Sequence, residues 1–166
     1  MMLEQYRTLA GYNTWMNARL YALAATLSDA ERRQDRGAFF KSIHGTFNHL
    51  LLTDRMWLYR FTDDPVLWKS RDHEGNTIQY RGALDQELYQ DFERLTAERA
   101  KTDAHVEAWV AGLDDARLAA PIRYRTTAGV EHEHPLWFSL PFHGHTSRRG
   151  GVLRSGFSSR IRAVHA

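Results

Sequence analysis

The chain has 166 residues, 43% of them apolar, and it contains no cysteine. A chain of this length buries about 70% of the surface that its unfolded form exposes, which suits one domain with its own core. The missing cysteines exclude disulfides, thiolate metal ligands and a thiol nucleophile within the chain, so metal chemistry would depend on 9 histidines and the carboxylates. No stretch approaches the roughly 18 apolar residues of a membrane span, and the first residues lack a signal-peptide core, so we expect a cytoplasmic protein.

The positive charge is concentrated in the C-terminal segment. The formal net charge is +2 and the pI is about 9.0, yet residues 142–166 contain five arginines and no acid. Without those five, 17 basic residues stand against 20 acidic ones, which leaves residues 1–141 at −3. We therefore predict a body of residues 1–141 and a basic, atypical tail of residues 142–166. The tail's arginines could attract phosphate, but no recognition motif appears, and we expect no nucleic-acid partner.

Helical periodicity begins near the N-terminus. The first long segment runs from about residue 3 to 26 and carries an apolar stripe at spacings of three, four and seven: Leu9, Met16, Leu20, Leu23 and Leu27. Ser28 and Glu31 then fit a capping box, which predicts a short helical turn ended by Gly37.

Two further long helices are expected, over about residues 38–61 and 84–113, with a loop over residues 62–82 between them. In the first of the two, apolar residues and one carboxylate alternate steps of four and three, the seam of an antiparallel bundle: Ile43, Phe47, Leu50, Asp54, Trp57 and Phe61.

The C-terminal third changes pattern. Residues 121–134 alternate in polarity around a turn at 127–129, which predicts a β-hairpin. Pro135 suits the first turn of a fourth helix, but Pro141 and several glycines interrupt it. The sequence thus predicts an all-α protein, a four-helix bundle with a small β-hairpin before an incomplete last helix.

His49 is the strongest candidate for a metal ligand. It lies beside the apolar seam, where a lone histidine most often bonds a carbonyl or a carboxylate. The more specific alternative is that His49 is a metal ligand, because neutral imidazole commonly binds zinc and nickel-type ions. Asp54 in the same helix could orient a neighbouring ligand, or form an ion pair on the helix face. His44 precedes His49 by five residues, about 140° around the helix, so we expect it to face solvent.

The other histidines are weaker candidates. His105 lies on a polar helix face and His73 in a polar loop, so both are expected in solvent. His132 and His134 share one face of the hairpin, where we favour a charged surface strand over chelation.

His143 and His145 are two residues apart, which on a helix points them about 160° apart. As helix residues they could not both reach the ion that His49 would bind, whereas in an irregular segment they could.

Several local patterns together resemble the DinB / YfiT-like superfamily of metal-dependent four-helix-bundle proteins. Tyr-Asn-Thr-Trp-Met-Asn at 12–17 is similar to the family's opening helix, and Phe-Asn-His-Leu at 47–50 with Asp-Arg-Met-Trp-Leu at 54–58 to its second. The hairpin ending at Trp137 also lies where the family has one. The resemblance covers about residues 3–140.

The resemblance implies one divalent ion, such as zinc, nickel or manganese, bound by three histidines. His49 matches the ligand of the second helix. The other two belong to a fourth-helix motif on which Phe-His-Gly-His-Thr-Ser-Arg at 142–148 can be laid. His143 then matches the first histidine, but Ser147 replaces the ligand four residues on, which leaves His145 as the substitute.

Either the site has diverged, or the tail is not in the ancestral reading frame. The run His-Thr-Ser-Arg at 145–148 can be encoded CAC-ACA-TCG-CGG-C, and one base later that string reads Thr-His-Arg-Gly. The nucleotide sequence decides between them, because a shifted frame without a family-like helix rules the second out.

Characterised members of the family are mostly thiol-dependent transferases or isomerases. The resemblance therefore implies a metal-dependent S-transferase-like enzyme that acts on a small molecule with a low-molecular-weight thiol. The alternative is a catalytically silent helical bundle, with a homodimer as one option, that has lost its metal.

Overall fold

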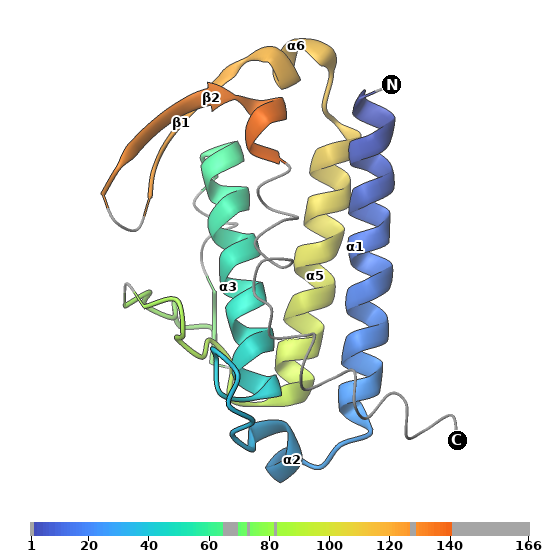
Figure 1. Ribbon diagram of the computed structural model, residues 1–166, viewed down its shortest axis with the longest axis vertical. Coiled ribbons are helices and arrows are strands. Elements are labelled where there is room, and N and C mark those ends of the chain that lie inside the picture. Colours follow the sequence, from blue (N-terminus) through green and yellow to red (C-terminus); the bar gives the residue numbers. More distant parts are fainter. Residues whose placement is uncertain (1, 65–69, 73, 82, 127–128, 141–166) are drawn as a thin grey trace.

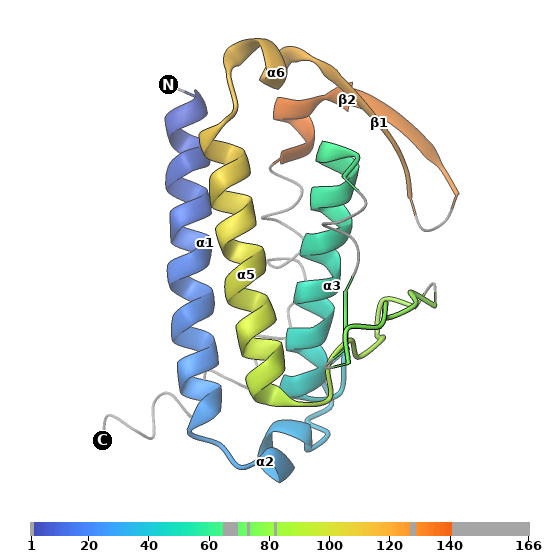
Figure 2. The ribbon, with the colours of Figure 1, turned by 180° about the vertical axis from the view of Figure 1, so that it is seen from behind.

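The computed structural model describes residues 2–64, 70–72, 74–81, 83–126 and 129–140. Three long helices run side by side, with α5 between α1 and α3 in both views (Figure 1, Figure 2). A short helix closes one end, and another short helix and a hairpin cover the other. The elements are α1 (Met2–Ala25), α2 (Asp29–Arg33), α3 (Ile43–Thr62), α5 (Phe92–Ala111), α6 (Asp115–Ala119), β1 (Pro121–Arg125) and β2 (Glu131–Pro135).

The predicted fold class is confirmed, since the molecule is mostly helical with an antiparallel hairpin before a short helical segment, residues 136–140. The continuation of that last helix, including Pro141, lies outside the described residues. None of the described helices is long and apolar enough to cross a membrane.

The first helix forms as predicted but turns a different face inward. α1 packs on α5 through its small and polar residues Ala10, Asn17, Tyr21 and Ala24, all buried. The predicted apolar stripe lies beside this face, so Leu9 is 56% and Leu23 40% exposed. The capping box of Ser28 is present at the start of α2, which ends at Arg33, before Gly37.

The second long helix begins five residues later than its periodicity suggests, at Ile43. Ser42 is its N-cap and accepts a hydrogen bond from the Gly45 amide at 3.0 Å. The buried face is also rotated by about one residue from the predicted seam. It includes four polar side chains that apolar periodicity does not detect, those of His44, Asn48, Thr53 and Arg55.

The third long helix begins eight residues later than predicted, at Phe92, with Asp91 as its N-cap. The preceding residues are held in a non-helical path by Asn48. Its side-chain oxygen accepts from the amides of Leu88 and Tyr89 at 2.8 and 2.9 Å, and its nitrogen donates to the Tyr89 carbonyl. A tertiary contact therefore overrides the local helical pattern of this segment.

The hairpin has the predicted strands, and residues 127 and 128 of the predicted turn lie outside the described residues. Ile122 pairs with His134 and Tyr124 with His132, and Gly129 closes the turn with a φ of +82°. Two apolar clusters fill the bundle. The cluster at the hairpin end consists of Ala10, Leu58, Phe61, Val106, Val110, Leu113, Leu118, Ile122 and Leu136. The cluster at the α2 end consists of Tyr21, Ala24, Phe47, Leu51, Leu52, Leu88, Tyr89, Phe92 and Leu95.

Candidate functional site

His49 lies in the second turn of α3, where two contacts fix its ring. Its Nδ1 is 2.7 Å from the carbonyl oxygen of Leu84, and its ring stacks on Phe40 with the centroids 3.6 Å apart. Both partners come from outside α3, because Phe40 precedes the N-cap and Leu84 belongs to the segment before α5. The side chain is half-buried and held in one orientation.

The contact with Leu84 also decides the tautomer of His49. A carbonyl oxygen only accepts, so Nδ1 carries the proton and donates, and Nε2 keeps its lone pair. Burial lowers the pKa of His49, although the Leu84 carbonyl and the charge of Asp54 act to raise it. The ring is therefore neutral at pH 7, and the lone pair of Nε2 is available to bind a metal ion.

Asp54 lies about one and a half turns after His49 on α3. Its carboxylate forms an ion pair with Arg99 of α5, which also pairs with Asp103 at 2.6 Å. Asp103 in turn accepts from the amide of Asn17 on α1 at 3.0 Å. The ion pair expected as one alternative for Asp54 is therefore present, although it joins two helices and is mostly buried.

A second buried ion pair lies beside the first. Arg55 donates to the carboxylate of Glu98 at 2.6 Å and to the hydroxyls of Thr102, Ser70 and Tyr89. Lys101 and Arg55 lower the pKa of Glu98 against the opposing effect of its burial, which is the largest single cause. Arg55, Arg99 and their partners form a charged layer that ties α3 to α5.

The expectation that His44 faces solvent is wrong. Its side chain is fully buried, and Nε2 donates to the Tyr89 carbonyl at 2.9 Å. Burial and the neighbouring Arg33 lower its pKa. Among the described residues, its Nδ1 has no hydrogen-bond partner. Periodicity misplaced His44 because the inward face of α3 is polar at this end, where the helix meets the segment that contains Tyr89.

The remaining histidines fall in three places. His105 is exposed on α5, as predicted. His132 and His134 share one hairpin face, as predicted, and are half-buried against Tyr124 and Phe138. Four others lie outside the described residues: His73, His143, His145 and His165. Within the described residues no group of three or more histidines, aspartates and glutamates is placed to hold a metal ion.

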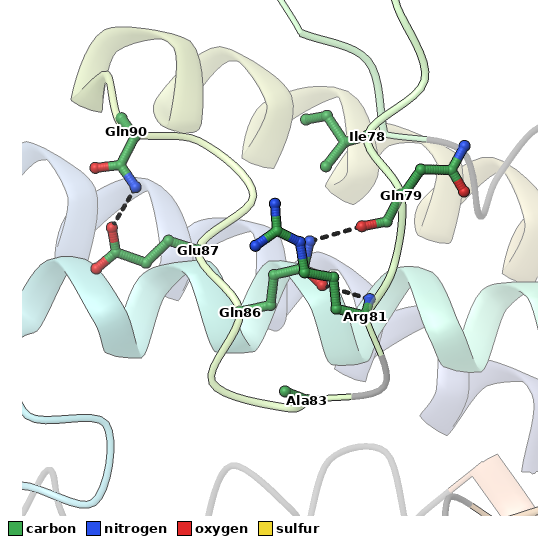
Figure 3. A pocket seen from close by; sticks show the side chains of 7 residues that line it. All are labelled: Ile78, Gln79, Arg81, Ala83, Gln86, Glu87 and Gln90. Carbon is green, nitrogen blue, oxygen red and sulfur yellow. Dashed lines mark hydrogen bonds between the residues drawn. The ribbon is translucent and has the colours of Figure 1, made fainter.

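A hollow of about 650 Å³ opens on the segment that contains Leu84 (Figure 3). Its polar walls are braced by Gln86, which donates to the Gln79 carbonyl and accepts from the Arg81 amide, both at 2.8 Å. None of its seven lining residues is a histidine: they are Ile78, Gln79, Arg81, Ala83, Gln86, Glu87 and Gln90. The imidazole of His49 is therefore not part of this hollow.

Sequence reasoning found His49 but missed what orients it. The Leu84 carbonyl lies in a stretch predicted to be helical, where it would have been occupied within the helix. The local signal was Asn48, a buried amide next to His49 with four hydrogen-bonding positions to fill.

The fold and these side chains define a class of protein, a helical bundle with a hairpin before its last helix and one oriented histidine on the second long helix. The model of the DinB superfamily matches residues 12–148, and the chain belongs to that superfamily. The matched range includes His49, His143 and His145, and it ends at residue 148, the last residue of the run on which the reading-frame hypothesis depends. Neither the curated proteins nor the solved structures gave a match.

Proposed function

We propose that this protein is a divalent-metal-dependent enzyme of the thiol S-transferase type, with His49 as its best-defined ligand. The observation that carries the proposal is the hydrogen bond from His49 Nδ1 to the Leu84 carbonyl. Metal-binding histidines characteristically donate their second ring nitrogen to such an acceptor, which fixes the tautomer and aims the other nitrogen at the ion. Membership of the DinB superfamily supports the same role.

The donor set fits the proposed ion in part. His49 supplies one neutral nitrogen, and His143 and His145 are the proposed second and third ligands, which lie outside the described residues. A bound divalent ion with an open position would lower the pKa of a thiol and supply a thiolate at neutral pH. The chain has no cysteine, so the thiol is a small external molecule, and the other substrate is a second small molecule.

Metal analysis of the purified protein tests the proposal directly. We expect about one zinc, nickel or manganese ion per chain, and its loss in His49→Ala. His105→Ala is the matched control, because His105 is exposed on α5 and should leave the metal content unchanged. Metal contents that are equally near zero in the wild type and in His49→Ala contradict the proposal and favour the silent bundle, whether monomer or homodimer.

The thiol is tested separately, without a substrate. Cobalt(II) replaces the native ion, and 2-mercaptoethanol is added as the probe. Binding of its sulfur to cobalt produces a charge-transfer band in the near ultraviolet, which we expect in the wild type and not in His49→Ala. A protein that binds cobalt but gives no such band is a metalloprotein without the proposed thiol chemistry.

A further inference from the structure

A second hollow, of about 660 Å³, lies at the hairpin end of the bundle. The last turn of α3, the strand β1 and α6 contribute its walls, together with Tyr80 from the long connection. It is separate from the His49 region, because Arg60 in its wall is eleven residues further along α3, about 16 Å at the helical rise. Its lining includes four arginines and one acidic residue, Asp63.

Arg60 is held in this hollow by rings rather than by a carboxylate. Its guanidinium lies over Trp57 at 4.7 Å and near Tyr124 at 5.5 Å from the ring centroids, and one nitrogen donates to the Arg125 carbonyl at 3.0 Å. Burial lowers the pKa of Arg60, and the groups that act against that effect are tyrosines, Tyr124 and Tyr80. A guanidinium has five N–H donors, so this arrangement leaves most of its donor capacity for another acceptor.

Arg117 of α6 is in a comparable position. It donates to the Phe61 carbonyl at 2.7 Å, in the last turn of α3. All 20 aspartates and glutamates of the chain fall within the described residues, and none of them forms a salt bridge with Arg60 or Arg117 there. Two partly buried cations thus share one hollow without an ion pair to a carboxylate of the described residues, although Asp63 lines the same hollow.

The other two arginines of the hollow are already neutralised. Arg123 pairs with Glu133 at 2.9 Å across the hairpin, and Arg125 pairs with Glu131. These strand arginines show that carboxylates are available nearby and are used by the hairpin itself. The charges that remain in the lining are the positive charges of Arg60 and Arg117 and the negative charge of Asp63, which leaves the hollow with a net positive charge.

We propose that this hollow binds a small aromatic carboxylate. Arg60 and Arg117 line the same hollow, and a guanidinium binds the two oxygens of a carboxylate through paired hydrogen bonds. Tyr59, Tyr80 and Tyr124 line the same space, and aromatic side chains pack favourably against the ring of a ligand. The inference concerns a site apart from His49, so it does not depend on the proposed metal chemistry.

Calorimetric titration with benzoate tests the proposal. We expect one benzoate per chain and binding at least about tenfold weaker in Arg60→Gln, since a charge-assisted pair is lost. Benzyl alcohol, which keeps the ring and lacks the charge, and acetate, which keeps the charge and lacks the ring, should both bind more weakly than benzoate. Arg19→Gln is the matched control, because Arg19 also lies over a tryptophan, Trp15 at 4.9 Å, but outside the hollow.

An amide NMR map of the wild type keeps the test decisive if Arg60→Gln fails to fold. Benzoate should shift the amides of residues 60–63 and 122–126 and leave those around His49 unchanged. The proposal is overturned by equal benzoate affinity in the wild type and a folded Arg60→Gln, by shifts confined to other residues, or by no binding up to about 10 mM.

Discussion

Arginine has opposite surroundings in two regions of this molecule. In the α3–α5 interface, Arg55 and Arg99 are each almost fully buried and each pairs with a carboxylate of similar burial. In the hollow at the hairpin end, Arg60 and Arg117 are less buried and bond only backbone carbonyls and rings among the described residues. The same side chain thus serves two purposes.

This difference in surroundings distinguishes arginines that stabilise the fold from arginines that are available to bind a ligand. A buried ion pair is costly to break, because the remaining partner is left charged and unpaired in a poorly solvated site. A guanidinium on an aromatic ring at the edge of a hollow remains partly hydrated and keeps free donors. The interface charges should therefore govern stability, and the charges of the hollow should govern binding.

Removal of Arg99 should have the largest effect. Arg99→Ala leaves Asp54 and Asp103 facing each other without their shared cation, and we expect a loss of about 3–5 kcal/mol in the free energy of unfolding. Urea denaturation followed by circular dichroism measures it. Arg19→Ala, an exposed arginine on α1, is the control and should change stability by less than about 0.5 kcal/mol. Equal effects in the two variants would remove the distinction between the two regions.

Asn48→Ala should have the next largest effect on stability. It leaves the buried amides of Leu88 and Tyr89 without their hydrogen-bond acceptor, and we expect a loss of about 1–3 kcal/mol in the free energy of unfolding. Those two amides should also exchange with solvent faster, as hydrogen-exchange NMR can show. Asn76→Ala, in an exposed turn, is the matched control. Unchanged exchange at Leu88 and Tyr89 would mean that Asn48 does not hold the segment before α5.

The buried His44, at the start of α3, should make stability depend on pH. Burial lowers the pKa of His44 in the folded state, so below the unfolded value of about 6.5 the unfolded chain binds more protons than the folded one. The free energy of unfolding should therefore fall as pH falls from about 7 toward the folded pKa. His44→Gln should flatten this slope, measured with a chelator present, whereas His105→Gln should not. His49, whose pKa is also lowered, should supply part of the slope that remains.

Much of the fold followed from local pattern. The spacing of apolar residues and the capping residues predicted α1, the capping box at Ser28 and both strands of the hairpin. These features depend on residues that are close together in the sequence. The start of α5 was misplaced because its boundary depends on Asn48, some forty residues earlier in the sequence. The inward faces of α1 and α3 were misplaced because they are partly polar, and apolar periodicity does not register buried amides or ion pairs.

The candidate sites divide in the same way. His49 could be singled out because its residue type and its neighbours Phe47 and Asn48 resemble a family motif, but its tautomer depends on a carbonyl of another segment. The hollow had no sequence signal. Arg60, Arg117 and Tyr80 come from three separate segments, and only the fold shows that the two arginines share a hollow and form no ion pair with the described carboxylates.

Arg60→Gln should have the smallest effect on stability and the most specific effect on binding. It removes one hydrogen bond to a carbonyl and the contacts with Trp57 and Tyr124, about 1 kcal/mol together. Urea denaturation of Arg60→Gln and Arg99→Ala compares their losses of stability directly. Benzoate titration of the same samples compares their affinities for the ligand. A loss in Arg60→Gln as large as that in Arg99→Ala would mean that Arg60 is a structural cation like those of the interface. A small loss of stability together with weakened benzoate binding would instead place the two arginines in different roles. Arg60 would then contribute mainly to the affinity for the ligand, and Arg99 mainly to the free energy of unfolding.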